Sequence, residues 1–177
     1  MLLAFVLMCI PDFSNWDAIP ISASPGGRPI ASRLLRPVDT STPKPLLVVL
    51  HGMGERGIDS TSALKYLPKL MDTPKRRRDF PCYVFVPQCP PNETWSVISR
   101  TQISAAPFGD FPEPPMAAVE QGILDILATE NVDASRIYLC GLSMGGFGTW
   151  DLLSRRPEWF AAAGPICGGA NQIHAPR

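Results

Sequence analysis

Four short runs of apolar residues limit what this chain can fold into. They are LLVVL at 46–50, YVFVP at 83–87, RIYLC at 136–140 and FAAAGPI at 160–166. Short apolar runs bounded by turn signals, rich in β-branched residues and leucine, are typical of strands buried on both faces of a sheet. We therefore expect these four runs to form strands in the protein core.

Helical patterns separate the strands. Before the third run, apolar residues at helical spacing predict a helix of about four turns: Met116, Val119, Ile123, Ile126 and Leu127. Further helices are predicted from 144 to 155, before Pro157, and within 60–71, with Pro68 limiting the length. This alternation implies right-handed crossovers between parallel strands. The predicted fold class is α/β, a mainly parallel sheet with helices on both faces.

The composition is typical of one globular domain, and its balanced charge does not indicate a highly charged partner such as a nucleic acid. Of the 177 residues, 45% are hydrophobic, and 16 Lys and Arg balance 16 Asp and Glu. Without a net field, nucleic-acid binding is not expected, and the basic run KRRRD at 75–79 is interpreted as a solvated loop. Prolines cluster in 11–45 and 81–115, which predicts loops there, including a long one over 90–115.

The first ten residues, MLLAFVLMCI, are apolar and stop at Pro11. The run is too short for a membrane span of about 20 residues, so no stable span is expected. It has the length of a signal-peptide core, although no Lys or Arg precedes it. The compartment therefore stays open between cytoplasm and secretion. Residues 1–27 are interpreted as an apolar N-terminal segment and linker.

The five cysteines do not decide the compartment. A Cys82–Cys89 disulfide requires the chain to turn back between them, because an extended strand holds the two residues about 20 Å apart. Cys140 lies in an apolar run and is expected to be a buried free thiol.

The segment Gly141-Leu142-Ser143-Met144-Gly145 fits the pattern GxSxG between a predicted strand and a predicted helix. In such a nucleophile elbow the chain turns so sharply that side chains two positions from the serine collide with neighbouring backbone, and glycines are needed there. The turn predicts Ser143 as a catalytic nucleophile. The backbone N–H of Met144 is expected to donate to the oxyanion hole.

A second glycine-rich segment supports the first. His51-Gly52-Met53-Gly54 directly follows the strand LLVVL and is similar to the loop that supplies the other oxyanion donor in this kind of site, here the N–H of Met53. His51 is expected to fix this loop structurally. The glycines of the two segments that we assign to the site are Gly52, Gly54, Gly141 and Gly145.

Residues 52–57 also read GxGxxG, the pattern of a dinucleotide site. Such a site needs an acidic residue at the end of the next strand. That strand runs into Pro87 and Gln88, and Asp79 precedes it. We therefore expect neither a cofactor nor a metal.

The stretches LLVVLHGMGERG, FVPQCPPNETW and VDASRIYLCGLSMGGFGTWDLLSRRPEWFAAAGPICGG resemble the α/β-hydrolase superfamily. Within it they are similar to serine esterases of the phospholipase/carboxylesterase-like, polyhydroxybutyrate-depolymerase-like and "predicted peptidase" group, over roughly residues 44–170. The resemblance implies a cofactor-free esterase that cleaves small or polymeric carboxylic esters through an acyl-enzyme on Ser143. It also places Trp95 in a loop beside the substrate pocket.

The chain departs from the family after Ser143, because the family's acid and histidine follow the nucleophile on later loops. Here only Asp151, Glu158 and His174 follow. Asp151 lies eight residues along the same predicted helix, about 12 Å from the serine, and cannot orient a base there. His174 is the remaining candidate base, in a polar tail before the expected strand of the acid.

We therefore expect residues 28–177 to be a partial α/β-hydrolase domain, truncated before its last strands and weak or inactive by itself. An unpaired sheet edge then predicts self-association. Two alternatives stay open: a non-catalytic binding domain on the same scaffold, and a peptidase of prolyl-oligopeptidase type.

Overall fold

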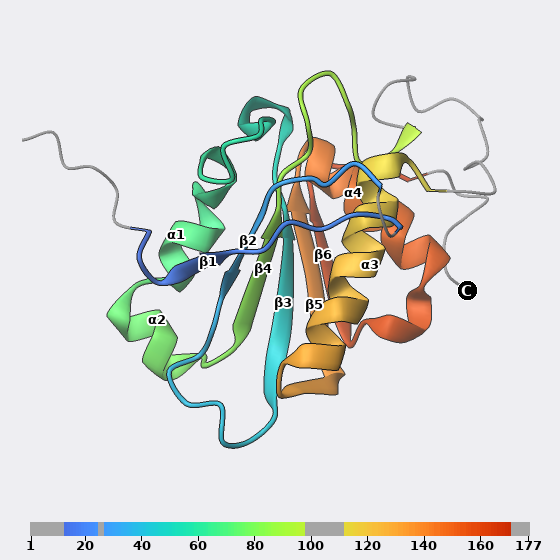
Figure 1. Ribbon diagram of the computed structural model, residues 1–177. Coiled ribbons are helices and arrows are strands. Elements are labelled where there is room, and N and C mark those ends of the chain that lie inside the picture. The colour runs from blue at the N-terminus through green and yellow to red at the C-terminus, as the bar shows by residue number, and fades with distance from the viewer. Residues whose placement is uncertain (1–12, 25–26, 98–111, 171–177) are drawn as a thin grey trace, which may run out of the picture.

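The computed structural model describes residues 13–24, 27–97 and 112–170. Its centre is a six-stranded sheet in the order β1-β2-β4-β3-β5-β6 (Figure 1). The strands β4, β3, β5 and β6 are parallel, and β2 pairs antiparallel with both β4 and β1. The strands are β1 Trp16–Ala18, β2 Ser32–Leu35, β3 Lys44–Leu50, β4 Tyr83–Pro87, β5 Val132–Leu142 and β6 Ala162–Ile166.

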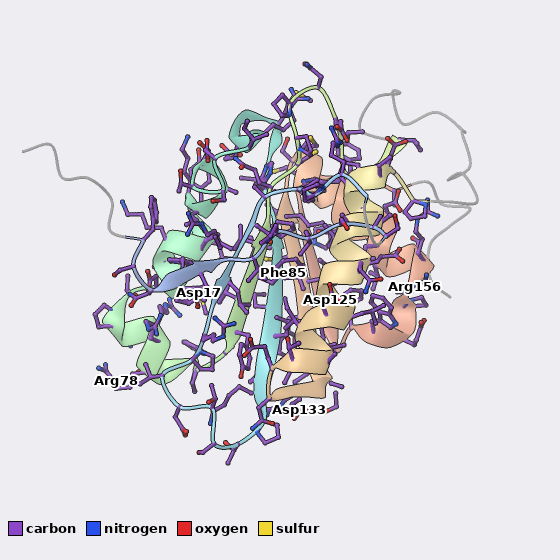
Figure 2. The ribbon with its side chains drawn as sticks, viewed as in Figure 1. Asp17, Arg78, Phe85, Asp125, Asp133 and Arg156 are labelled. Carbon is purple, nitrogen blue, oxygen red and sulfur yellow. The ribbon has the colours of Figure 1, made fainter. Side chains whose placement is uncertain are left out.

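The four predicted apolar runs form the parallel part of this sheet. Every residue of β4 is buried, and in the paired registers Val48 of β3 lies between Phe85 of β4 and Leu139 of β5. Figure 2 shows Phe85 at the centre of the molecule, whereas Asp125 lies on the outside. The mainly parallel α/β architecture expected from the sequence is confirmed.

Helices cover both faces because alternate residues of β3 point to opposite sides. Leu46, Val48 and Leu50 pack with α3 (Pro114–Thr129) and α4 (Met144–Arg155) in one hydrophobic cluster. Leu47 and Val49 belong to a second cluster with η2 (Ser62–Leu64) and α1 (Leu67–Met71). In Figure 1, α1 and α2 (Pro74–Asp79) lie on one side of the sheet and α3 on the other.

Two local predictions were wrong. The single helix predicted within 60–71 is divided into η2 and α1, because Tyr66 between them has φ 58°. Pro68 begins α1 instead of limiting a longer helix, since the first turn needs no proline N–H. The basic run at 75–79 lies in the helix α2, where the Thr73 side chain caps the helix by accepting a hydrogen bond from Arg76 N–H.

The sheet also begins earlier than expected, because β1 lies inside the segment interpreted as a linker. Trp16 is buried and its Nε1 donates a hydrogen bond of 2.8 Å to Asp72. The apolar residues 1–10 lie outside the described residues. Within the described part of the chain, no helix is long and apolar enough to cross a membrane.

The described cysteines are free thiols. Cys82 and Cys89 lie at opposite ends of the extended strand β4, so no turn brings them together. Cys140 is half-buried, and this burial raises its pKa to about 11. Among the described strands, β6 pairs with β5 alone and forms one edge of the sheet. The self-association expected at this edge stays a prediction.

Candidate active site

Ser143 occupies a strained turn between β5 and α4. Its backbone has φ 54° and ψ −113°, a conformation that costs energy for any residue with a side chain. The Ser143 N–H donates to the Ile166 carbonyl at 2.8 Å, and its carbonyl accepts from Phe147 N–H at 3.1 Å. The turn is thus fixed by both β6 and the first turn of α4, at the carboxyl end of the parallel strands.

The two glycines around Ser143 are there for steric reasons. A Cβ on Gly141 would stand 2.1 Å from the Gly145 carbonyl oxygen, and a Cβ on Gly145 would stand 2.0 Å from the Leu50 carbonyl oxygen. Real Cβ atoms essentially never approach other atoms this closely. The glycine spacing therefore allows the start of α4 to pack directly against the end of β3.

The loop after β3 lies beside this turn. Gly52 is extended and precedes the 3-10 turn η1 (Met53–Glu55), and a Cβ on Gly52 would lie 3.8 Å from the Cβ of Ser143. Met53 is half-exposed, whereas Met144 is buried at the start of α4. No described group accepts a hydrogen bond from the backbone N–H of either methionine. Two unengaged donors therefore lie on the two segments that meet at Ser143.

Gly54, the fourth glycine predicted for the site, differs from the other three. A Cβ added to it would meet no atom within 4 Å, and its φ is outside the left-handed range. Neither close packing nor backbone conformation explains a glycine at this position.

His51 holds the loop and has no free nitrogen. The ring is 5% exposed, its Nε2 accepts a hydrogen bond of 2.9 Å from Cys89 N–H, and its Nδ1 lies 2.6 Å from the Gly52 carbonyl. Because Nε2 accepts a hydrogen bond and Nδ1 faces a carbonyl oxygen, the ring is assigned as the neutral tautomer with its proton on Nδ1. Burial also lowers the pKa of His51 to about 4. His51 therefore has no lone pair to offer Ser143.

Trp95 lies beneath the site instead of beside a pocket. Its side chain is fully buried, its Nε1 donates to the His51 carbonyl at 3.1 Å, and its ring meets the His51 ring edge to face. The Trp95 Cβ also fills the space that a side chain on Gly148 of α4 would need. The ring therefore belongs to the core, and the expectation that its loop borders the substrate pocket stays a prediction.

The acidic residues described after Ser143 are not brought to it. Asp151 is 1% exposed and forms an ion pair with Arg155 one turn further along α4. Glu158 lies on the exposed 3-10 turn η4 (Pro157–Trp159). His174 lies outside the described residues, so its role as a base stays a prediction.

Sequence reasoning missed Glu55. Its side chain is 8% exposed, and its Oε2 lies 3.1 Å from the position of a Cβ on Gly52, next to Ser143. The signal for it was weak, because an acidic residue five positions after a strand is ordinarily solvated. Only the packing of the loop after β4 against η1, where the Gln88 side chain donates to the Glu55 carbonyl, shows that this residue is mostly buried.

A cavity of about 130 Å³ opens beside the turn. Its walls come from the ends of β3, β5 and β6 and from the segment between η2 and α1, and they are mainly apolar. Glu55 and Lys65 are its charged side chains. The cavity therefore gives a small apolar group room close to Ser143.

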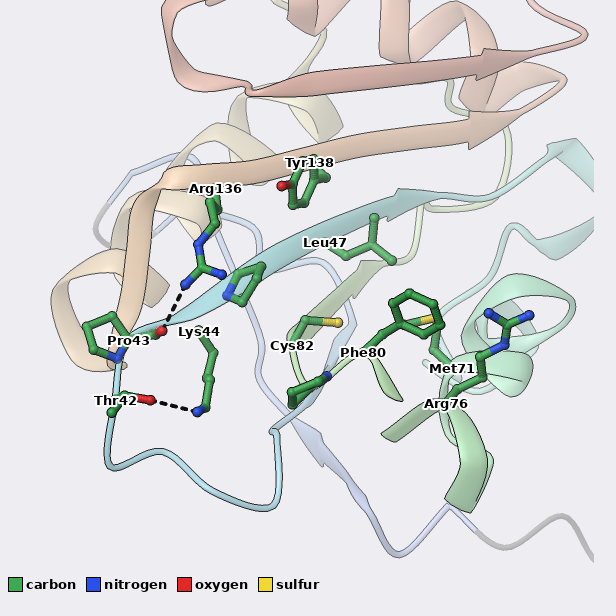
Figure 3. Close-up of a pocket in the computed structure, with 12 residues that line it drawn as sticks. Thr42, Pro43, Lys44, Leu47, Met71, Arg76, Phe80, Cys82, Arg136 and Tyr138 are labelled. Carbon is green, nitrogen blue, oxygen red and sulfur yellow. Dashed lines mark hydrogen bonds between the residues drawn. The ribbon is translucent and has the colours of Figure 1, made fainter. Parts of the chain in front are cut away.

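A wider groove of about 680 Å³ lies at the opposite, amino-terminal ends of the parallel strands (Figure 3). Thr42, Lys44 and Arg136 lie at one end of it, and Arg76 and Phe80 at the other. Because Ser143 follows the carboxyl end of β5, this groove is separate from the candidate site.

A strained serine between a parallel strand and the following helix is the arrangement of the α/β hydrolases. The chain has this fold: it matches a solved thermostable esterase with a TM-score of 0.79 and 38% identity, covering 91% of this chain and 43% of that one. S-formylglutathione hydrolase from Staphylococcus aureus matches with a TM-score of 0.60 at 18% identity, covering 87% of this chain and 58% of that one.

One further relative matches by sequence. Poly(3-hydroxyalkanoate) depolymerase C of Paucimonas lemoignei is 38% identical over 52 residues, which are 29% of this chain and 13% of that protein. No model of a protein family matches the chain. The chain thus spans less than half the length of the esterase that it resembles, and the truncation expected from its sequence stays a prediction.

Proposed function

We propose that this chain carries the nucleophile and oxyanion hole of a serine hydrolase that cleaves carboxylic esters. The observation that carries the proposal is the turn at Ser143, whose positive φ is held by backbone hydrogen bonds and by two glycines that no other residue can replace. Backbone strain of this kind costs energy and persists at functional sites, where it positions a reacting group. The similarity to an esterase over 91% of the chain supports the same conclusion.

In the proposed reaction, Ser143 Oγ attacks the ester carbonyl carbon as its proton passes to a base. The carbonyl oxygen becomes an oxyanion that accepts hydrogen bonds from the N–H groups of Met53 and Met144. The amino end of α4 adds a favourable dipole. Collapse of the intermediate expels the alcohol and leaves an acyl-enzyme, which water hydrolyses to the acid.

Two of the similar proteins, an esterase and a depolymerase of a polyester, support an ester as the substrate over a peptide. The cavity of about 130 Å³ beside the turn suits a short acyl or alcohol group. We therefore expect p-nitrophenyl acetate to be hydrolysed in preference to a peptide anilide. Faster cleavage of the anilide would favour the peptidase alternative.

Labelling with a fluorophosphonate probe tests Ser143 directly. We expect any label and any p-nitrophenyl acetate turnover of the folded 177-residue chain to be weak, to arise at one site, and to be lost in Ser143→Ala. Intact-mass spectrometry measures the label.

Ser154→Ala is the matched control, because Ser154 lies on the same helix and its hydroxyl is bonded to the Trp150 carbonyl. It should label like the parent chain. Labelling that persists in Ser143→Ala would contradict the proposal, whereas no labelling of a folded parent chain would mean that it holds only half of the site and lacks the base. The variant His174→Ala shows in the same assay whether that histidine contributes.

A further inference from the structure

The wider groove at the amino-terminal ends of the parallel strands has no part in the proposed function. Its volume of about 680 Å³ lies within the range of small-molecule sites, about 300–1,000 Å³. Lys44 lines the groove and begins β3, whereas Leu50 ends β3 beside the turn of Ser143. A strand of this length places these two residues about 20 Å apart. The groove is therefore a separate candidate binding site.

The floor of this groove is apolar. Figure 3 shows Leu47 and Cys82 in its middle, with Tyr138 above them and Met71 and Phe80 to one side. Burial raises the pKa of Cys82 to about 11, so its thiol stays uncharged near neutral pH. Among the described residues, no acidic side chain lines the groove. Such a floor is suited to a hydrocarbon or aromatic group.

The charged side chains that line the groove are all cationic, namely Lys44, Arg76 and Arg136. Lys44 lies 3.5 Å from Asp39, and Arg136 lies 2.6 Å from Asp133. Both are ion pairs at the surface, where such pairs are weak. Three cations against these two carboxylates leave the rim of the groove positive. The charge of the rim is thus complementary to an anion.

Arg76 is the lining cation without an acidic partner among the described residues. Its Cζ lies over the Phe80 ring, 5.2 Å from the ring centre. Asp79, on the same helix, is instead paired with Lys75 and Arg78. A guanidinium on an aromatic face keeps the N–H donors at its edge available, and their fork matches two oxygens of a carboxylate or sulfonate. Arg76 is therefore placed to bind an anionic group at the edge of an apolar floor.

We propose that the wider groove binds an organic anion with a flat or extended apolar body, and that Arg76 holds its charged group. Aryl and aliphatic carboxylates and sulfonates are the ligands of this class. The apolar body lies along Leu47 and Cys82. It extends toward the Tyr138 hydroxyl, which has no hydrogen-bond partner among the described residues. This binding does not depend on ester cleavage at Ser143.

Two matched probes test the site. Anilinonaphthalene sulfonate joins a sulfonate to aromatic rings, and N-phenylnaphthylamine has the same rings without the charge. The fluorescence of both increases in apolar surroundings. We expect the sulfonate to bind the folded chain saturably at one site. In Arg76→Gln its dissociation constant should rise about tenfold or more, as expected when a hydrogen bond to a charged group is lost, while that of the neutral probe stays unchanged.

Arg78→Gln is the matched control for charge, because Arg78 lies on the same helix, is exposed and does not line the groove. It should bind both probes like the parent chain. Phe80→Ala should weaken both probes, since their rings contact this side chain. Val38→Ala, a change at an exposed apolar residue outside the groove, should weaken neither. The melting temperatures of all variants establish that they are folded.

Several outcomes would overturn the proposal. Equal affinity of the sulfonate for Arg76→Gln and Arg78→Gln removes the role of Arg76. A folded chain that shows no saturable binding removes the site. Dimers in sedimentation, at concentrations where the probe does not bind, would mean that a second copy covers the groove instead of a ligand. Ser143→Ala should bind the probe like the parent chain, so failure of this inference and failure of the proposed function are told apart.

Discussion

Replacing Gly145 by alanine is expected to lower the free energy of unfolding by about 3 kcal/mol or more. The added Cβ would stand 2.0 Å from the carbonyl oxygen of Leu50 and 2.8 Å from that of His51. Both atoms belong to the backbone at the end of β3, and a backbone in a central strand cannot move aside as the end of a side chain can. The start of α4 must therefore shift away from the sheet.

Urea unfolding followed by tryptophan fluorescence measures this loss. Gly54→Ala is the matched control in the neighbouring loop, because a Cβ there meets nothing within 4 Å. We expect its free energy of unfolding to stay within about 0.5 kcal/mol of the parent value. Equal losses in the two variants would mean that glycine content, and not the contact between α4 and β3, determines stability. An insoluble Gly145→Ala beside a soluble Gly54→Ala would agree with the expectation.

The central part of the fold was predictable because its signals are local. Strands such as β4, buried on both faces, must be apolar along their whole length, and the sequence shows this directly. The helix predicted from 144 to 155 is α4, Met144–Arg155. Its start follows from the turn glycines and its end from Pro157, and neither depends on distant residues.

The outer elements were missed because their stability comes from distant contacts. In β1 only Trp16 is buried, and its ring is held by Asp72, a residue 56 positions away. In α2 the charges suggested a loop, although Thr73 and Pro74 are a good helix start. Solvent-exposed helices of this length have no apolar stripe to reveal them.

In the candidate site, too, the local features were predictable and those that depend on distant contacts were not. The steric need for glycines around Ser143 follows from the turn itself and was anticipated. The burial of Trp95 under His51 and the enclosure of Glu55 depend on how the chain after β4 packs against the loop after β3. Nothing within either segment specifies that contact, so the burial of Trp95 was not foreseen and Glu55 was overlooked.

The protein is expected to lose stability on mild acidification because of His51. Burial lowers the pKa of His51 from 6.5 to about 4 in the folded state. Above pH 6.5 the ring is neutral in both the folded and the unfolded state, and its burial adds no dependence of stability on pH. Between pH 6.5 and 4 the unfolded chain binds a proton that the folded chain does not. The free energy of unfolding therefore decreases as the pH is lowered through this range. The loss is about 2 kcal/mol by pH 5 and about 3 kcal/mol by pH 4, at about 1.36 kcal/mol for each pH unit.

Unfolding in urea at several values between pH 7 and 5 isolates this effect, because carboxylates such as Asp133 titrate lower. The Ser135 hydroxyl and Arg136 hold the pKa of Asp133 at about 2. In His51→Gln we expect a lower stability at pH 7, since the bonds to Cys89 and Gly52 change, but a nearly flat dependence down to pH 5. A slope as steep as that of the parent chain would show that another group titrates in this range and that His51 accepts a proton while folded.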